Sequence, residues 1–541
     1  MRFFAAQAKL PSVPNILLAV ISACLLMLAF PNFDLWFLAW FALVPLFYAI
    51  EREKQSAIKS FVLGWIFGIC FFFGTCWWLT YAPITYGGVP ASIAYLLFFG
   101  VTLVAGFFPA IFSAAFSVLL KRFGTYAILS APFLWMATEF LRFNLTGNNW
   151  NAIGYSQAFT NHLIQTAQIG GVYLVGFWII VFNSIIALNF FSIIRILTAK
   201  NFSYTNSDAN KSIVYFSLLI SLFIVPFALF PKFNFTDNPN DKIESVVVAV
   251  QPNVPMSGLK YGELEKLRQR HVELAENALQ KIQRTDEQPT IVIFPESPMN
   301  FQYESDREFK TFLKDFATRN NASVLFNSAQ PNTRGTNFYN SAVMVNPQGG
   351  KIAQYDKIHL VPFGETVPLP AALAQFVPTM VGNFEIGENY NLFPFGDAKG
   401  GVMICFESHF PSLAREFVRG GADVLIEMTN DGYLGDTPIL RQHLANAVFR
   451  AVETNRPVLR VTNVGVTAYI NERGEVLDAA KPYTEDTRIW TGSKSDNSQT
   501  FYVKYGDWFA WLCSIVSLAL LFLSLWISKT NGKTYAENFS S

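Results

Sequence analysis

Residues 401–408 read Gly-Val-Met-Ile-Cys-Phe-Glu-Ser, an apolar run that ends in the thiol of Cys405 and the carboxylate of Glu407. A second apolar run, residues 291–295, leads in the same way into Glu296. Active sites of open α/β sheets form beyond the carboxyl ends of the strands. If both runs are strands, their endings therefore predict a site where a thiol and carboxylates meet.

Working outward from these runs, short apolar segments rich in β-branched residues alternate with polar, helix-like segments from residue 243 onward. The expected strands are 244–251, 289–295, 322–327, 339–345, 402–405, 423–427 and 458–462. The expected helices are 263–284, 307–319, 411–419 and 439–455. Such alternation predicts an α/β domain, with a two-layer sheet core covered by helices. Residues 351–400 are rich in Pro, Gly and Phe, and we expect a long functional or mobile loop there.

A polar loop, residues 355–365, separates the two strand endings in the sequence and contains Lys357 and a later glutamate, Glu365. A thiol becomes a good nucleophile as its thiolate, and a nearby carboxylate can take its proton. An ammonium group can stabilise the oxyanion of a tetrahedral intermediate. A Glu or Lys alone at a strand end is usually a solvated charge. The order of the three residues, together with the flanking Pro-Glu-Ser and Cys-Phe-Glu-Ser, predicts a catalytic site of Glu296, Lys357 and Cys405.

The cysteine count and net charge exclude several classes of protein. Of five cysteines, Cys405 alone lies between residues 231 and 507, so this region cannot form an internal disulfide. No Cys or His spacing resembles a metal site. The net charge of +1 gives no indication of a nucleic-acid-binding surface.

The first 230 residues are almost continuously apolar. The whole chain of 541 residues is 52% hydrophobic and only 15% charged, whereas about 25% is usual for soluble domains. About 20 apolar residues cross a bilayer as a helix. Candidate spans are 13–30, 33–50, 61–79, 91–120, 125–143, 169–194, 212–230 and 508–527. We therefore expect a membrane α-helical bundle of about eight helices, with seven in 1–230, the α/β domain in 231–507 and the eighth helix in 508–541.

Lys and Arg residues fall on one side of these predicted spans. They occur in the N-terminal segment, in the loops after the second, fourth and sixth spans, and in the C-terminal tail, but not in loops 80–90 and 144–168. Positively charged loops face the cytoplasm. The pattern predicts cytoplasmic termini and places residues 231–507 outside the cytoplasm.

Glu139 and Arg142 stand three residues apart within the fifth predicted span. Ionisable groups at membrane depth are costly and often functional. Arg142 also lies near the end of the span, where a long side chain can reach the interface. A functional and a structural interpretation of this pair both remain open from the sequence.

The strand endings resemble the nitrilase superfamily, in which Glu, Lys and Cys follow one another in this order. The matching segments are 294–296, 356–365 and 404–407. More narrowly, the whole chain resembles the apolipoprotein N-acyltransferase family. Segments similar to signatures of that family are 28–36, 139–142, 154–157, 250–255, 429–436 and 442–443. The resemblance implies a nitrilase-like α-β-β-α sandwich on a bundle in the bacterial inner membrane, with the sandwich on the periplasmic side.

The resemblance also implies roles for residues. Glu296 would be the general base, Lys357 the oxyanion stabiliser and Cys405 the nucleophile, with Glu365 and Glu407 in support. The implied reaction is ping-pong: the sn-1 acyl chain of a phospholipid, commonly phosphatidylethanolamine, passes to Cys405 as a thioester. It then passes to the α-amine of a diacylglyceryl-modified N-terminal cysteine of an apolipoprotein. No cofactor or metal is implied, and we expect a monomer.

Aromatic residues depart from the family pattern near the site. Phe406 stands where tyrosine is common, and Tyr433 and Tyr261 stand where tryptophan is common. Asn148-Asn149 replaces a Phe-Pro pair before Trp150. Such exchanges preserve an apolar groove while they change its shape. We expect Phe406, Tyr433, Trp150, Tyr261 and His443 to bind substrate.

Two other classes of function compete with the acyltransferase. A membrane-anchored amidase or nitrilase-type hydrolase would use the same three residues and release the acyl group to water, but anchoring alone needs a single helix. A transporter or receptor would use the outer domain only for binding. Few ionisable groups lie at mid-membrane depth and no internal repeat is evident, which argues against a transporter.

Overall fold

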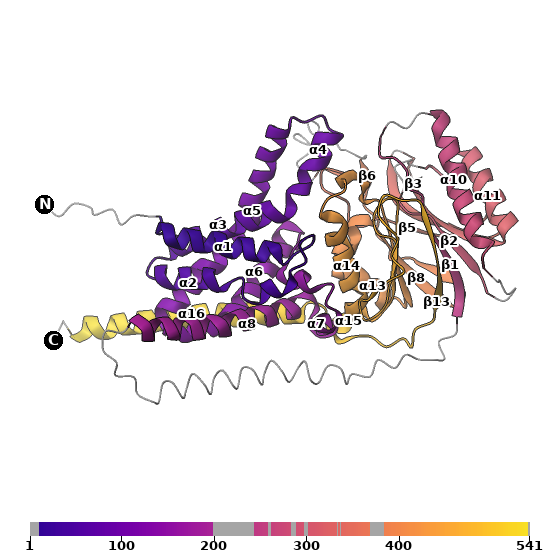
Figure 1. Ribbon diagram of the computed structural model, residues 1–541. Coiled ribbons are helices and arrows are strands. Elements are labelled where there is room, and N and C mark those ends of the chain that lie inside the picture. The colour runs from indigo at the N-terminus through magenta and orange to yellow at the C-terminus, as the bar shows by residue number, and fades with distance from the viewer. Residues whose placement is uncertain are drawn as a thin grey trace. The chain divides into compact units, whose positions relative to one another are not determined.

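The computed structural model describes residues 10–198, 243–257, 261–282, 288–296, 301–332, 334–335, 337–367 and 383–538 (Figure 1). The chain divides into two compact units. The first, a helical bundle, comprises Met1–Thr80, Ala91–Phe235 and Asp507–Ser541. The second, an α/β domain, comprises Thr236–Gly506 and the short segment Tyr81–Pro90. The α/β domain is therefore discontinuous in sequence.

The bundle is built from apolar helices joined by short 3-10 turns. Its main helices are α1 (Val13–Leu28), α2 (Val44–Glu53), α3 (Ala57–Cys76), α5 (Ala91–Phe123), α6 (Ala131–Thr146), α8 (Ala167–Thr198) and α16 (Trp508–Asn538). Four helical stretches in the described part of the chain are long and apolar enough to cross a membrane: Ala57–Thr85, Ala91–Thr146, Ala167–Phe191 and Trp508–Ile527. These features define a membrane protein with several apolar helices.

Eight spanning helices are not found among these described residues. The predicted span 33–50 is broken into a 3-10 helix, Trp36–Trp40, and the ten-residue α2. Pro45 lies in the first turn of α2, where proline starts a helix rather than continuing one. α1 is apolar but has only 16 residues. The predicted span 212–230 lies outside the described residues.

Small residues determine how closely α3 and α5 pack. A Cβ atom added to Gly68 would lie 2.6 Å from the Cα atom of Gly106, and one added to Gly64 would lie 2.3 Å from the backbone oxygen of Pro109. Helices in membranes pack through such small residues, because apolar side chains gain little by leaving lipid. The predicted span 91–120 is one 33-residue helix that contains Pro109.

Two sheets form the core of the α/β domain. The first has the order β13 (Asp486–Ser493), β1 (Ile243–Gln251), β2 (Thr290–Ile293), β3 (Ala322–Pro331), β4 (Phe338–Val345) and β5 (Lys351–Asp356), with β6 (Phe384–Glu385) also paired to β4. The second has the order β12 (Val476–Leu477), β11 (Ala468–Ile470), β10 (Val458–Thr462), β9 (Val424–Thr429), β8 (Ala398–Ile404) and β7 (Leu392–Phe395). In each sheet the central strands are parallel and antiparallel strands flank them.

Helices cover the outer face of each sheet (Figure 1). α10 (Tyr261–Leu279) and α11 (Arg307–Asn320) share a buried apolar cluster with the first sheet. α13 (Pro411–Arg419) and α14 (Ile439–Thr454) contact the second sheet through β8 and β10. The result is the nitrilase-like α/β sandwich that the sequence predicts. The strands that end in the candidate site residues, β2 and β8, lie in different sheets.

Each of the seven predicted strands corresponds to an observed one, but the interpretation of residues 351–400 as a long loop is wrong in part. β5, β6 and β7 lie within it. β5 reads Lys-Ile-Ala-Gln-Tyr-Asp and is mostly exposed or half-buried, so it lacks the apolar pattern by which buried strands are recognised. Residues 368–382 of this region lie outside the described residues.

Candidate active site

Cys405 is the first residue of a 3-10 helix, Cys405–His409, that directly follows β8. Its φ angle is +54°, in the left-handed region that residues with a side chain rarely adopt. Such a conformation costs on the order of 1–3 kcal/mol and persists only where surrounding contacts enforce it. The abrupt turn from strand to 3-10 helix takes the thiol out of the sheet.

Carboxylate and ammonium groups meet this thiol from the first sheet. Glu296 follows β2, forms a hydrogen bond with Cys405, and its Oε1 atom lies 3.8 Å from the Nζ atom of Lys357. Lys357 follows β5 and is fully buried. Asn340 on β4 donates its side-chain amide to Glu296 at 3.1 Å. The three residues predicted as a catalytic site are therefore brought together from three strand endings.

Glu365 is the second carboxylate that contacts Lys357. Its Oε1 atom lies 2.8 Å from Nζ of Lys357 and accepts the side-chain amide of Asn340 at 2.7 Å. Its Oε2 atom accepts the backbone N–H of Val361 at 2.8 Å. This local bond fixes the carboxylate within its own loop, so that one ammonium group faces two carboxylates.

The charges of this cluster set its protonation states. Burial works to lower the pKa of Lys357, but the carboxylates of Glu365 and Glu296 outweigh burial and hold the pKa above its usual range. Lys357 is therefore a permanent ammonium group. Burial raises the pKa of Glu296 although Lys357 opposes the change. A raised pKa makes a carboxylate a stronger base.

The thiol is protonated at rest. Burial, and next the negative charge of Glu296, hold the pKa of Cys405 well above its usual value, although Lys357 acts to lower it. A thiolate will therefore form only as its proton leaves to a neighbouring base. The Glu296 carboxylate, which bonds to the thiol, is placed for that transfer.

Glu407 connects the two sides of the site. One carboxylate oxygen accepts the backbone N–H groups of Ile358 and His359 at 2.8 and 3.1 Å and the hydroxyl of Tyr355 at 2.7 Å. The other accepts the backbone N–H of Ile404 at 2.8 Å. Glu407 is fully buried. It therefore ties the loop after β5 to the end of β8, and so holds Lys357 near Cys405.

Two of the expected substrate-binding residues lie in the neighbourhood of the thiol. Phe406 follows Cys405, and its ring stacks on His409 with 5.4 Å between centroids. Burial, and next the charges of Glu296 and Cys405, raise the pKa of Tyr433 above its usual range, so its hydroxyl stays neutral. A neutral phenol is a hydrogen-bond donor and an apolar surface at once.

The segment Tyr81–Pro90 supports the loop that carries Tyr433. Tyr86 donates its hydroxyl to the carbonyl of Gly432 at 3.3 Å, and its ring meets that of Tyr433 edge-on at 6.1 Å. Tyr81 packs so closely on Gly435 that a Cβ atom added there would lie 2.5 Å from its ring. No pattern in the sequence predicts that this segment belongs to the α/β domain.

The other expected substrate-binding residues have different surroundings. Trp150 belongs to the bundle, where its ring lies 5.5 Å from that of Trp78. Tyr261 is the first residue of α10, and its side chain lies outside the described residues. His443 is buried on α14 and contacts the backbone oxygen of Cys405 at 3.1 Å.

Sequence reasoning missed Asn340, which bonds to both Glu296 and Glu365. A polar residue at a buried position of an apolar strand is a signal that could have identified it. Asn340 is 6% exposed, within the strand Phe-Tyr-Asn-Ser-Ala-Val-Met-Val. The sequence predicts no role for Asn327 on β3 either. The side-chain amide of Asn327 donates to the side-chain oxygen of Asn340 at 2.7 Å and thereby orients Asn340.

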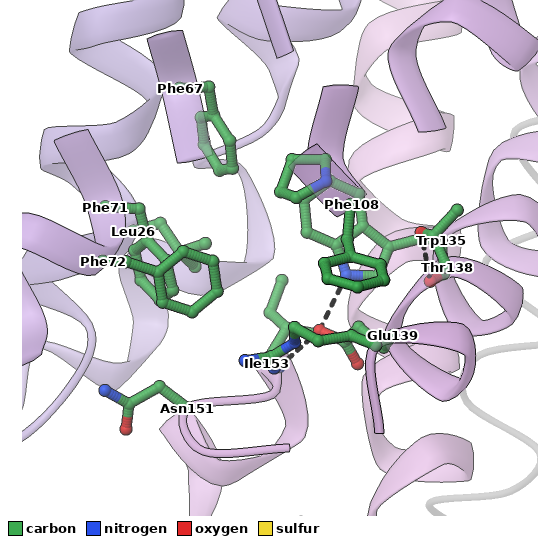
Figure 2. Close-up of a pocket in the computed structure, with 12 residues that line it drawn as sticks. Leu26, Phe67, Phe71, Phe72, Phe108, Trp135, Thr138, Glu139, Asn151 and Ile153 are labelled. Atoms are coloured by element: carbon green, nitrogen blue, oxygen red, sulfur yellow. Dashed lines mark hydrogen bonds between the residues drawn. The ribbon is translucent and has the colours of Figure 1, made fainter. Parts of the chain in front are cut away.

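The bundle contains a separate buried polar pair, Glu139 and Arg142, which line one cavity. Figure 2 shows Glu139 among the aromatic residues that line this cavity. Glu139 accepts the indole N–H of Trp135 at 3.0 Å and the backbone N–H of Ile153 at 2.9 Å. Arg142 donates to the backbone oxygen of Trp150 at 2.9 Å. The adjoining cavity, of about 20 Å³, has room for one water molecule but not for a lipid headgroup. These contacts favour the structural interpretation of the pair.

Comparison with protein families agrees with this division of the chain. Residues 22–185 match the apolipoprotein N-acyltransferase N-terminal domain, and residues 247–495 match the carbon-nitrogen hydrolase family. Yeast Nit3, a member of branch 10 of the nitrilase superfamily, is a similar solved structure: 17% identity, a TM-score of 0.35, and coverage of 47% of this chain and 91% of that one. Bundle and sandwich together define a membrane-bound enzyme of the nitrilase superfamily.

Full-length relatives narrow this class. An apolipoprotein N-acyltransferase of Geobacter metallireducens is 32% identical over 506 residues, which cover 92% of each chain. Another, of Thermotoga maritima, is 29% identical over 529 residues, which cover 94% of each chain. The chain belongs to the apolipoprotein N-acyltransferase family, and is thus an acyltransferase.

Proposed function

We propose that this enzyme transfers the sn-1 acyl chain of a phospholipid, through a thioester on Cys405, to the α-amine of the diacylglyceryl-modified N-terminal cysteine of apolipoproteins. The observation that carries the proposal is the meeting of a buried thiol, a carboxylate bonded to it and a buried ammonium group at Cys405, Glu296 and Lys357. Family membership supports the choice of donor and acceptor.

In the first half-reaction, Glu296 takes the proton of the Cys405 thiol as sulfur attacks the ester carbonyl. The carbonyl oxygen gains a negative charge, which the ammonium group of Lys357 stabilises. The tetrahedral intermediate then collapses, the ester C–O bond breaks, and Glu296 returns the proton to the departing alkoxide. The products are an acyl thioester on Cys405 and a lysophospholipid.

In the second half-reaction, the acceptor amine attacks the thioester carbonyl, and Glu296 takes a proton from the nitrogen. Lys357 again faces the oxyanion. Collapse breaks the C–S bond, forms the amide, and returns the proton from Glu296 to the sulfur. The site is then restored without any cofactor. Glu365 and Glu407 support both steps, because they hold Lys357 in position from two directions.

Aromatic side chains are the proposed contacts for the acyl chains. Phe406 follows Cys405 in the chain, and Tyr433 lies near enough to Glu296 and Cys405 for their charges to affect its pKa. We include Trp150 and Tyr261 among the substrate contacts because of their place in family-like segments. Phosphatidylethanolamine is the proposed donor, and a single chain is the proposed working unit.

For topology, we propose a bundle formed by residues 1–230 and 508–541, with both termini in the cytoplasm, and a catalytic domain formed by 231–507 on the periplasmic side. The one-sided distribution of Lys and Arg supports this orientation. Protease added outside intact spheroplasts should cut within 243–506 and spare the C-terminal tail. A cut tail with an intact domain would mean that the orientation is reversed.

The covalent intermediate gives the most direct test of the chemistry. Purified full-length protein in detergent is mixed with phosphatidylethanolamine that carries a tagged sn-1 acyl chain, without acceptor. Wild type and the Cys24→Ala control should acquire a label that hydroxylamine removes, whereas Cys405→Ala should acquire none. Cys24 is an exposed bundle cysteine, so this control removes a thiol without touching the site.

The acceptor is tested next by adding a diacylated lipopeptide to the labelled enzyme. The label should move to the peptide α-amine as an amide that resists hydroxylamine. Release of free fatty acid as the main product would instead mean that the enzyme is a hydrolase. A label retained by Cys405→Ala would contradict the proposed nucleophile.

A further inference from the structure

His443 lies behind the nucleophile rather than in open space. Its Nδ1 atom is 2.7 Å from Oδ1 of Asp431, and its Nε2 atom is 3.0 Å from Oε1 of Glu427. The same Nε2 atom is 3.1 Å from the backbone oxygen of Cys405. The imidazole is 3% exposed. Both ring nitrogens are therefore engaged within the protein.

The partners of this ring determine its charge. A backbone oxygen can only accept a hydrogen bond, and an ionised carboxylate likewise only accepts. Arg460 contacts Oε2 of Glu427 and lies 2.7 Å from Oδ2 of Asp431. Burial works to raise the pKa of both carboxyl groups, but Arg460, and next His443, outweigh burial and keep them ionised. Both nitrogens of His443 must then donate, which makes the ring an imidazolium.

The cluster balances its charges without solvent. Glu427 on β9, Asp431 just after β9, His443 on α14 and Arg460 on β10 are each at most 3% exposed. Two carboxylates face two cations. Burial works to lower the pKa of His443, but Asp431 and Glu427 outweigh it and raise the pKa to about 9. A neutral side chain at position 443 would leave one negative charge uncompensated close to Cys405.

Cys405 has a φ angle of +54°, in the left-handed region that residues with a side chain rarely adopt. Because a peptide unit is planar, a bond that fixes the backbone oxygen of Cys405 fixes the whole plane between Cys405 and Phe406. It also restrains the direction in which the Cys405 side chain leaves the backbone. From the other side, Glu407 holds the peptide between Met403 and Ile404, at the end of β8, through the N–H of Ile404.

We propose that His443 is a positioning residue for the nucleophile: its imidazolium holds the backbone oxygen of Cys405 and keeps the thiol directed at Glu296. This inference rests on the proposed function, in which Cys405 is acylated. It assigns His443 to the rear of the thiol instead of to the substrate pocket. In this proposal, the charges of Glu427, Asp431 and Arg460 keep the imidazole ring of His443 protonated.

The test compares two buried histidines of the α/β domain. His443→Gln removes the cation and one of its two donor directions. His271→Gln is the matched control, because His271 is also buried, at 5% exposed, and bonds to the backbone oxygen of Leu267 at 2.7 Å. Both variants are prepared as full-length protein in detergent, and thermal unfolding gives the folded fraction of each.

The first readout is the alkylation of Cys405 by iodoacetamide between pH 6 and 10, followed on its own peptide by mass spectrometry. The groups that act on the thiol are Glu296, Lys357, Asp431 and Arg460. Loss of the His443 cation leaves the charge of Asp431 less compensated, which should raise the pKa of Cys405 and lower the alkylation rate at each pH by about tenfold, the equivalent of a profile shifted upward by about one pH unit. His271→Gln should leave the profile in place. This readout needs no phospholipid.

The second readout is the single-turnover rate of thioester formation with the tagged phospholipid. His443→Gln should slow it by about 100-fold per folded molecule, as expected for a misplaced reacting group, and His443→Lys should recover part of the rate by restoring the charge. An unshifted alkylation profile with a wild-type acylation rate would overturn the proposal. An equal loss of acylation rate in His443→Gln and His271→Gln would mean that His443 contributes only to packing. If wild type forms no thioester, the proposed function fails, while alkylation still decides on His443.

Discussion

Oε1 of Glu365 lies 2.8 Å from Nζ of Lys357, closer than the 3.8 Å that separates this ammonium group from Oε1 of Glu296. Glu365 therefore takes the tighter ion pair, and Glu296 keeps more of its basicity for the thiol. Glu365→Gln loosens the hold on Lys357 and should slow thioester formation by about 100-fold, as expected for a misplaced reacting group. Single-turnover acylation measures this rate, and a rate within twofold of wild type would contradict the assignment.

The same variant should change the pH dependence of acylation. The charge of Glu365 raises the pKa of Glu296, so its removal lowers that pKa. A base of lower pKa is deprotonated at lower pH, and the rising limb of the rate should therefore move to lower pH. Rates measured between pH 4 and 9 give the position of this limb.

Asn340→Asp should move the rising limb of the pH dependence of acylation to higher pH, opposite to the effect of Glu365→Gln. The side-chain amide of Asn340 donates to Glu296 at 3.1 Å and to Glu365 at 2.7 Å. A carboxylate in its place adds a third negative charge, which raises the pKa of Glu296. The rising limb should then move to higher pH, with a lower rate at pH 7. Asn340→Ala, which adds no charge, is the control, and equal profiles for the two variants would exclude the electrostatic explanation.

Glu407→Gln should reduce stability. The carboxylate of Glu407 receives only donors, from Tyr355, Ile358, His359 and Ile404. An amide would turn an N–H group toward at least one of them, which costs about 1–3 kcal/mol for the unsatisfied donor. Thermal unfolding in detergent should show a lower midpoint. Glu416→Gln, which removes an exposed ion pair with Arg419, should cost less than about 1 kcal/mol.

Arg142→Met should weaken the bundle. The guanidinium of Arg142 donates to the backbone oxygen of Trp150 at 2.9 Å and to the side-chain oxygen of Asn149 at 3.2 Å. Methionine fills similar space but removes both charged hydrogen bonds, each of which contributes about 1.5–3 kcal/mol. The unfolding midpoint should fall, whereas the exposed Lys121→Met at the end of α5 should leave it unchanged. Equal midpoints would favour a functional interpretation of the pair.

Tyr433→Trp should retain acylation and change its selectivity. Both side chains are aromatic, but indole is larger, and Tyr433 is close enough to Glu296 and Cys405 for their charges to affect its pKa. Phospholipids with acyl chains of about 12 to 18 carbons, in steps of about two carbons, compete in one assay. The variant should favour a different acyl length from wild type. An unchanged product distribution would mean that the acyl chain does not pass this residue.

The sequence predicted the parts of the site that follow buried strands. Glu296 and Cys405 each follow a short, continuous apolar run, and both runs are strands. Lys357 could be found because it belongs to a polar loop between them. Asn340 could not be predicted, because a single amide side chain within a strand does not indicate a site by itself. Its role depends on the folded chain, which directs this amide toward two carboxylates.

Edges and connections were harder to predict than central strands. β13 reads Asp-Thr-Arg-Ile-Trp-Thr-Gly-Ser and pairs with β1 at the margin of its sheet, where polar residues are tolerated and the apolar signal is weak. In the described part of the bundle, composition located apolar helices but not where they break. The break between the 3-10 helix at Trp36–Trp40 and α2 depends on local turn geometry, which mean hydropathy does not report.

The segment Tyr81–Pro90 has a consequence for how the protein is made. It leaves the ribosome long before the loop it supports, since Tyr86 and Gly432 are 346 positions apart. During synthesis this segment lacks its partner loop until the sandwich is complete. Apolar helices flank the segment on both sides in the sequence. A fragment that starts after residue 235 would lack this support and leave Gly435 without the cover of Tyr81. Maturation of the thiol site is thus linked to membrane insertion by the order in which the chain emerges.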